Sequence, residues 1–336
     1  MLTFNYFGDV KKTLYDENYK HSLSLMQQAG VTVLWLEIYM AGRYLAEKEE
    51  IIKAKLILEN LGFEVHVITI PVGHPGNSLN PEEMMELGLP AHWHYRVNAQ
   101  GEQEYFSACV DDVVIAENRK VVEFCRDAGF KKLFFDDDLR MGNHGDVIRG
   151  CFCERCLQEF ANRVGTYYTR EQLAQNCAQK TELSEQWIEY NCSKITKFMV
   201  ETAVPGMQTG IMVMHNGGRY HGIDIPAIKK ALPDCLFRVG ELQFDDNAFE
   251  NDAGHAYELQ SMRTHLQWID NLAVSYSETT VFPPRTLSPQ NMVKKAELAI
   301  GEGIYNIFLM SGSWTMTDEY WQAFIDNQCY LRQLEK

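Results

Sequence analysis

Short apolar runs alternate with longer amphipathic stretches from one end of this chain to the other. The short runs are rich in β-branched and aromatic residues, and the longer stretches repeat their apolar positions with the spacing of a helix. This pattern predicts eight strands, each followed by a helix or by a loop that leads to one. The predicted strands cover residues 2–7, 31–38, 64–70, 132–137, 209–214, 236–241, 273–277 and 304–310.

The apolar character of the predicted strands indicates how they assemble. Strands that are apolar almost throughout and separated by helices are typical of a parallel sheet covered by those helices. Eight repeats of the unit favour closure into a (β/α)8 TIM barrel. An open doubly wound sheet usually carries a glycine-rich phosphate-binding turn after its first strand, and residues 7–12 lack one. We therefore predict an α/β fold in which residues 1–336 form a single catalytic barrel.

Two long insertions interrupt the repeat. The first covers residues 71–112, after the third strand, and the second covers residues 139–207, after the fourth. The second insertion carries a cysteine-rich turn and helices, the last of them around residues 185–200. Since the loops after barrel strands build the catalytic face, both insertions are expected to lie there.

Composition and charge exclude several classes of partner. The net charge of −15, from 31 basic and 46 acidic side chains, argues against nucleic acid and against an anionic membrane as partners. No apolar run approaches the length of a transmembrane helix, and no export signal opens the chain. Nine cysteines, an odd number, then indicate reduced thiols and a cytoplasmic location. The oligomeric state is left open, with a homo-oligomer as one alternative.

Three cysteines stand within six residues, as Cys151, Cys153 and Cys156 in a C-x-C-x-x-C run. One short turn can thus offer three thiolates, and Cys109 is our candidate for the fourth ligand of a tetrahedral zinc ion. Four sulfur ligands leave no open position, so the zinc would be structural. The alternative is a set of free thiols, because cysteine is often a small core residue. The other cysteines are expected mostly in the core: Cys125, Cys177, Cys192, Cys235 and Cys329.

Polar and aromatic residues gather where the predicted strands end. The candidates for the walls of a site are Glu37, His74, Asp136, Asp137, Asp138, Arg140, His215, Asn216, Glu241, Tyr276, Glu278 and Trp314. A mouth rich in carboxylates and aromatic rings and poor in cations suits sugars, because hydroxyl groups need acceptors and sugar rings pack on aromatic faces. Trp314 is the expected platform. The predicted partner is therefore a small carbohydrate.

Two of these carboxyl groups fit the requirements of glycoside cleavage. That reaction needs one protonated carboxyl group and one carboxylate on either side of the anomeric carbon. Asp138 and Glu278 are placed for these roles. For Glu278 the alternative is an ordinary solvated loop acid. For Asp136, Asp137 and Asp138, three adjacent like charges that repel one another, the alternatives are a solvated turn or a cradle for a divalent metal.

Together, the upstream cysteine, the acidic triplet and the C-x-C-x-x-C run resemble glycoside hydrolase family 42, the zinc-containing β-galactosidases of clan A. In that family the fourth strand ends in Asp-Asn-Glu. The resemblance implies that Asp138 is the acid/base, that Glu278 is the nucleophile, and that the three cysteines of the turn hold zinc together with Cys109. This chain has Asp137 in place of the Asn and Asp138 in place of the Glu. Galactose specificity is therefore not transferred.

The sequence thus predicts a glycosidase, an O-glycosyl hydrolase of the retaining type, that cleaves a small glycoside or oligosaccharide. Asp137, Glu241 and Glu37, with His74 and His215, are expected to fix the hydroxyl groups. One alternative is a barrel that acts on a sugar or sugar acid as a lyase or isomerase, with a divalent ion on the aspartates. A second alternative is a sugar-binding barrel without catalysis.

Overall fold

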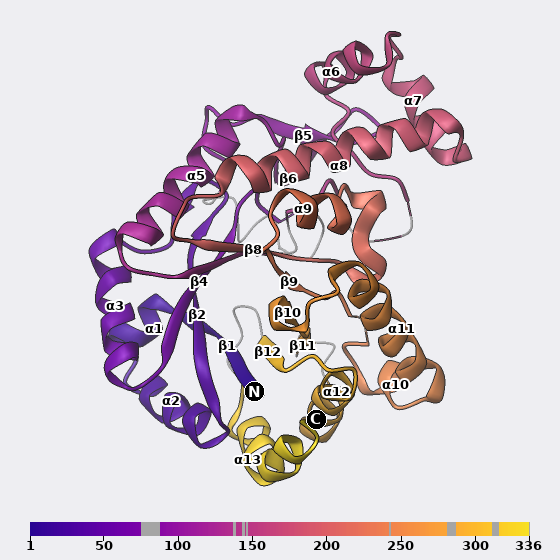
Figure 1. Ribbon diagram of the computed structural model, residues 1–336. Helices are drawn as coiled ribbons and strands as arrows, with labels where there is room; N and C mark the ends of the chain where they lie inside the picture. The colour runs from indigo at the N-terminus through magenta and orange to yellow at the C-terminus, as the bar shows by residue number, and fades with distance from the viewer. Residues whose placement is uncertain are drawn as a thin grey trace.

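A closed barrel of eight parallel strands forms the body of the protein (Figure 1). The computed structural model describes residues 1–74, 88–136, 139–142, 145, 147–241, 243–280, 287–310 and 316–335. The barrel strands are β1 (Thr3–Asp9), β2 (Val31–Met40), β4 (Glu64–Ile70), β7 (Lys132–Phe135), β8 (Gln208–Met212), β9 (Leu236–Arg238), the pair β10 (Ser275–Tyr276) and β11 (Thr279–Thr280), and β12 (Asn306–Met310). The ring closes because β1 pairs in parallel with both β12 and β2. The predicted (β/α)8 fold is confirmed.

Helices cover the outside of the barrel, as Figure 1 shows. They are α1 (Val10–Tyr15), α2 (Tyr19–Gln28), α3 (Lys48–Asn60), α5 (Asp112–Asp127), α9 (Ile225–Ala231), α10 (Asp246–Phe249), α11 (Asp252–Ile269), α12 (Pro289–Gly301) and α13 (Asp318–Gln333). The two ends of the chain meet, since the N-terminal ammonium lies 2.8 Å from Oε1 of Glu335. None of the described helices combines the length and the apolar character needed to cross a bilayer.

The segments after the third and fourth barrel strands carry further elements. After β4 come the two strands of an antiparallel hairpin, β5 (Tyr95–Val97) and β6 (Gln103–Ala108). After β7 come α6 (Glu154–Val164), α7 (Arg170–Gln179) and α8 (Glu182–Thr202), and α8 includes the helix expected at residues 185–200. α8 packs against α5 and α9, whereas α6 and α7 lie at the outer edge of the molecule in Figure 1. A short strand, β3 (Arg43–Tyr44), pairs antiparallel with β2.

Aromatic rings fill the interior of the barrel. The ring of Trp35 lies 4.7 Å from that of Phe134, 5.9 Å from that of Tyr276 and 5.8 Å from that of Phe308. Side chains alternate between the two faces of a strand, so Glu37, two residues beyond Trp35, also lies on the inner face of β2. Because the rings close the interior, a substrate site is expected above them, at the carboxyl ends of the strands.

The seventh strand differs from its prediction. Ala273 and Val274 belong to a 3₁₀ turn, η3 (Leu272–Val274), and the strand is interrupted between β10 and β11. The side chain of Asn271 accepts a hydrogen bond from the N–H of Ala273 and so favours the turn. At the interruption, the hydroxyl of Ser277 accepts a hydrogen bond from the N–H of Phe308. Glu278 therefore lies in a break of the strand.

Three other strands end earlier than predicted. β7 ends at Phe135 instead of residue 137, β8 at Met212 instead of residue 214, and β9 at Arg238 instead of residue 241. Single backbone hydrogen bonds continue the pairing beyond the strand ends, from Asp136 N–H to the Thr69 carbonyl and from Val213 N–H to the Arg238 carbonyl. The residues just beyond these strand ends are still buried, so the sequence pattern of a strand continues past the last residue that pairs in the sheet.

Candidate functional site

Glu241 and Glu278 bind each other's backbone at the carboxyl ends of the sixth and seventh barrel strands. The N–H of Glu241 donates to Oε2 of Glu278 at 2.6 Å, and the N–H of Glu278 donates to Oε1 of Glu241 at 2.9 Å. Both residues are buried, with 1% and 7% of their surface exposed. The two carboxylates are therefore held in fixed positions relative to both strand ends.

Buried cations neutralise these two carboxylates. Nη2 of Arg238, the last residue of β9, lies 3.0 Å from Oε1 of Glu278. Nζ of Lys295, in α12, lies 3.5 Å from Oε2 of Glu241 and 3.2 Å from Oε1 of Glu258 in α11. A basic side chain therefore lies within 3.5 Å of each of the two carboxyl groups.

Sequence reasoning missed Arg238, Glu258 and Lys295. A signal was present for Arg238 and for Lys295. Arg238 is a charged residue in an apolar strand, and Lys295 falls among the buried positions Met292, Ala296 and Ala299 on one face of α12. A charge on the apolar face of a predicted helix indicates a buried ion pair.

The other predicted polar residues lie near the strand ends in different environments. Glu37 is half-buried on β2, opposite Asp9 of β1, and His74 is half-buried just beyond β4. Asp136 is buried directly after β7. Arg140 is fully buried; its Nε donates to the carbonyl of Gly142, and its own carbonyl accepts from Arg96.

Several predicted residues cannot be placed in this geometry. Asp137, Asp138 and Trp314 lie outside the described residues. His215 and Asn216 begin a 3₁₀ helix, η2 (His215–His221). Their proposed contacts with substrate stay predictions.

Tyr276 lies in the aromatic core of the barrel. Its ring is 5.0 Å from that of Phe134, and only 3% of its surface is exposed. Burial raises the pKa of its hydroxyl group, so the phenol remains neutral. Contact with a sugar stays a prediction for this residue, and its observed packing is that of a core side chain.

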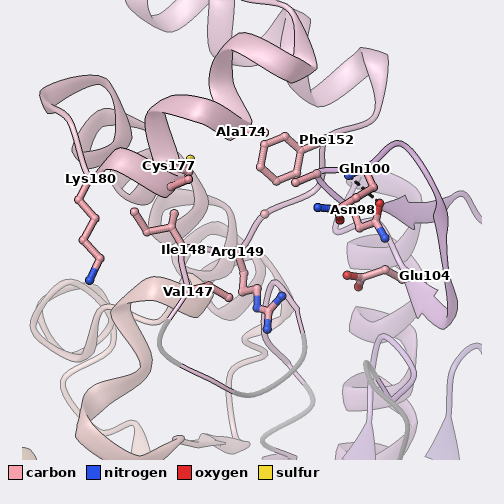
Figure 2. Close-up of a pocket in the computed structure, with 13 residues that line it drawn as sticks. Asn98, Gln100, Glu104, Val147, Ile148, Arg149, Phe152, Ala174, Cys177 and Lys180 are labelled. Carbon is pink, nitrogen blue, oxygen red and sulfur yellow. Dashed lines mark hydrogen bonds between the residues drawn. The ribbon is translucent and has the colours of Figure 1, made fainter.

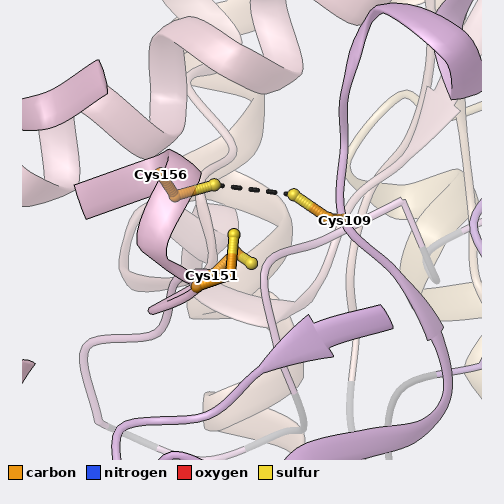
Figure 3. Close-up of side chains that lie close together, drawn as sticks. Cys109, Cys151 and Cys156 are labelled. Carbon is orange, nitrogen blue, oxygen red and sulfur yellow. Dashed lines mark hydrogen bonds between the residues drawn. The ribbon is translucent and has the colours of Figure 1, made fainter. Parts of the chain in front are cut away.

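The structure brings the four predicted zinc ligands together. The Sγ atoms of Cys109, Cys151, Cys153 and Cys156 all lie within 4.8 Å of one another, and Figure 3 shows Cys109 facing the cysteine turn. Cys109 follows β6, Cys153 is the N-cap of α6, and Cys156 lies in the first turn of that helix. The N-terminus of a helix favours negative charge and so stabilises thiolates.

Two cations lie against the four cysteines. Nη2 of Arg155 donates to Sγ of Cys109 at 3.4 Å, and Nζ of Lys194 donates to Sγ of Cys156 at 3.6 Å. Nη2 of Arg155 also lies 2.6 Å from Oδ2 of Asp111, and Nζ of Lys194 lies 2.8 Å from Oε2 of Glu159. Each of the two cations thus contacts both a thiol of the cluster and a carboxylate outside it.

Hydrogen bonds among the four thiols shift their pKa values in different directions. Hydrogen bonding, first to Cys109 and then to the other two thiols, lowers the pKa of Cys153 and raises the pKa of Cys156. All four can ionise together only beside a positive ion, and four sulfur donors in a buried cluster suit a metal ion. This cluster could therefore hold one.

The remaining cysteines divide into two groups. Cys125, Cys177, Cys192 and Cys235 are buried, as expected, and burial raises the pKa of each thiol. The expectation of a core position was wrong for Cys329, which is exposed on α13. The sequence pattern predicted a helix with apolar residues near Cys329. It did not show which side of that helix, α13, faces the barrel.

A pocket of about 340 Å³ lies between the β5–β6 hairpin, the segment before α6, and α7 (Figure 2). Its polar lining includes Asn98, Glu104 and Arg149, and burial lowers the pKa of the Arg149 guanidinium. Its apolar lining includes Ile148 and Phe152. None of these residues was among the predicted site residues, because both segments read as irregular insertions.

Comparison with known proteins gives the fold. No family model matches this chain, and no curated protein sequence matches it. Solved structures that are similar include α-L-fucosidase isoenzyme 2 of Paenibacillus thiaminolyticus, at 10% identity and a TM-score of 0.59 over 98% of this chain and 49% of that chain. Another is the family 36 α-galactosidase AgaA of Geobacillus stearothermophilus, at 10% identity and a TM-score of 0.47 over 99% and 42%.

A third similar structure is D-psicose 3-epimerase of Clostridium cellulolyticum, at 9% identity and a TM-score of 0.47 over 100% of both chains. This chain spans less than half the length of the two glycosidases. What the fucosidase and this chain share is the barrel.

Proposed function

We propose that the protein is a retaining glycoside hydrolase acting on a small glycoside or oligosaccharide. The observation that carries the proposal is Glu278, a buried carboxylate fixed in a break of the seventh strand by Arg238 and by the backbone of Glu241. A carboxylate held rigidly at the carboxyl end of a barrel strand suits a nucleophile. Residues 1–336 would form one catalytic barrel, with residues 139–207 as its insertion.

In the proposed mechanism, Asp138 gives a proton to the glycosidic oxygen while Glu278 attacks the anomeric carbon. The bond to the leaving group breaks, and a glycosyl ester with Glu278 forms. Asp138, now ionised, takes a proton from water, and the resulting nucleophile cleaves the ester and restores Glu278. In this second step the guanidinium of Arg238 would stabilise the carboxylate of Glu278 as the ester is cleaved.

The remaining predicted residues would bind the sugar. Carboxylates, imidazoles and amides bind hydroxyl groups, and an indole ring packs on the apolar face of a sugar. The proposed set is Glu37, His74, Asp136, Asp137, Arg140, His215, Asn216, Glu241, Tyr276 and Trp314.

The resemblance to glycoside hydrolase family 42 supports both carboxyl assignments and the metal. We propose that Cys109, Cys151, Cys153 and Cys156 hold a structural zinc ion, since four thiolates leave no position for substrate. The zinc would join the segment after β6 to α6. A cytoplasmic location and a carbohydrate as the partner belong to the same proposal.

Turnover of a panel of nitrophenyl glycosides tests the proposed function. Glu278→Gln and Asp138→Asn should each lower kcat/KM by about two to four orders of magnitude, because each removes one of the two essential carboxyl groups. Glu319→Gln, at an exposed position of α13, is the matched control and should keep wild-type turnover. Undiminished activity in both carboxyl variants excludes these assignments.

Chelation separates this function from a lyase or isomerase with a divalent ion on the aspartates. The hydrolase should keep full activity after chelation that leaves the cysteine-bound metal in place. Loss of activity under those conditions, with recovery on adding Mg²⁺, would support the metal-dependent alternative.

A further inference from the structure

Five buried charged side chains contact one another in a continuous series, and the proposed nucleophile, Glu278, is one of them. Glu278 contacts Arg238 and Glu241, Glu241 contacts Lys295, and Lys295 contacts Glu258. Glu258 and Lys295 are both fully buried, on α11 and α12. The series therefore connects two outer helices to the ends of the sixth and seventh strands.

Stability alone gives little reason for this arrangement. Removing charges from water is expensive, and apolar residues of similar volume often replace a buried ion pair without loss of stability. Lys295 also lies 4.8 Å from the centre of the Phe244 ring, so an apolar side chain would find apolar neighbours there. A role in setting the position of other groups accounts better for the pair.

The two hydrogen bonds between Glu241 and Glu278 transmit position. Each carboxylate accepts the backbone N–H of the other residue, at 2.6 and 2.9 Å. A shift of the Glu241 carboxylate therefore moves the backbone of Glu278. Lys295 is the cation beside Oε2 of Glu241, the oxygen that does not take part in this exchange.

Among the described residues, the charges of this series leave one proton to be placed. Three carboxyl groups, of Glu241, Glu258 and Glu278, face two cations, Arg238 and Lys295. Burial raises the pKa of Glu258 to about 8, although Lys295 lowers it in part. Burial by itself lowers the pKa of Lys295, but Glu258, Glu241 and Glu278 together raise it above the ordinary value. At neutral pH Glu258 therefore holds the proton.

We propose that Lys295 and Glu258 are positioning residues, which hold Glu241 and, through it, the reactive carboxylate of Glu278. The proposal rests on the proposed function for the role of Glu278. While Glu258 is protonated, Lys295 is attracted mainly to Glu241. When Glu258 ionises, Lys295 is shared between two carboxylates, and Glu241 loses part of its support.

Kinetics of two single variants test the proposal. Lys295→Met should lower kcat by about 100-fold with little change in KM, because a small displacement of a reacting group costs about that much. Glu258→Gln imitates the protonated acid, so it should keep kcat near pH 7 and lack the decline in kcat that we expect of wild type above about pH 8. Lys294→Met and Glu297→Gln alter an ion pair on the outer face of the same helix and should match wild type.

A double variant separates positioning from folding. Glu258→Leu with Lys295→Met removes the two fully buried helix charges at once, and Glu241 keeps its hydrogen bond from the N–H of Glu278, so the barrel should fold even if Lys295→Met alone does not. Low kcat in the folded double variant supports the proposal. Wild-type kcat in it, or a wild-type alkaline decline in Glu258→Gln, overturns it.

Stability against pH supplies a test that needs no substrate. A carboxyl group with a raised pKa in the folded state stabilises the fold fully below its unfolded pKa of about 4.3, and this contribution is lost as pH rises toward 8. The unfolding free energy of wild type should therefore fall relative to that of Glu258→Gln across this range. If no glycoside is turned over, the hydrolase proposal fails alone; if the two pH curves are parallel, the positioning proposal fails.

Discussion

Gly210 is required at its position in β8 because its neighbours occupy the space of a side chain. A Cβ atom at this residue would lie 2.6 Å from Cβ of Leu236 and 2.6 Å from Cε1 of Phe134. Phe134 belongs to the ring-filled interior of the barrel and cannot move without disturbing Trp35 and Tyr276. The absence of one methyl group thus permits the packing of the core below the proposed site.

We predict that Gly210→Ala lowers the free energy of unfolding by about 1–3 kcal/mol, the usual cost of overpacking a core. Gly301→Ala is the matched control. No atom lies within 4 Å of a Cβ at that helical position, so alanine should stabilise the fold by up to about 1 kcal/mol. Urea denaturation measures both changes, and equal stability of Gly210→Ala and wild type would contradict the packing argument.

At the scale of elements, α6 packs on α8 through Phe160, and its first turn lies against the segment that follows β6. Cys153 caps the helix, Cys156 lies in its first turn, and both face Cys109 at the end of the β6 segment. A metal ion here would link α6 to the segment that leads into α5. Removing one cysteine ligand should therefore destabilise α6 and the segment that leads into α5, while the barrel strands keep their stability.

The prediction is that Cys156→Ser loses most of its zinc and that amide protons of α6 exchange faster, while those of the barrel strands do not. Cys329→Ser, which changes an exposed thiol, is the control and should retain about one zinc per chain. Elemental analysis and hydrogen exchange give the two readouts. Wild-type protein with far less than one metal per chain would remove the zinc assignment.

At the scale of the whole molecule, barrel closure decides which distant residues share one face. The β1–β2 and β1–β12 pairings complete the ring, and β7 and β10 then direct their carboxyl ends to the same mouth. This closure is what would allow the two proposed catalytic residues, 140 positions apart in the sequence, to act on one bond.

Glu278 as a nucleophile predicts that the first product has the anomeric configuration of the substrate. Retaining glycosidases place their two carboxyl groups about 5–5.5 Å apart, and inverting enzymes leave room for a water molecule between them. Proton NMR at early times of hydrolysis shows which anomer forms first. An inverted product would exclude the covalent intermediate on Glu278, while leaving the glycosidase class intact.

The sequence by itself determined the order of the eight barrel strands and the grouping of the four cysteines, but it did not show β3 or the β5–β6 hairpin. Apolar periodicity and the spacing of Cys151, Cys153 and Cys156 are local properties, so they can be read without knowledge of contacts. The strands were therefore predicted close to their observed bounds, and Cys109 was identified as the fourth cysteine of the cluster. Local pattern did not, however, locate the strand ends at residues 135, 212 and 238, because burial continues past the last ladder hydrogen bond.

Only the tertiary structure decided the surroundings of Glu278. The exchange of hydrogen bonds with Glu241, the ion pair with Arg238, and Lys295 between two carboxylates each join segments that are distant in sequence. A charged residue on an apolar helical face shows that a partner is needed but not which one. The partner is set by the register in which the strands close and by the packing of α11 and α12 against them, and neither is a property of any short stretch of the chain.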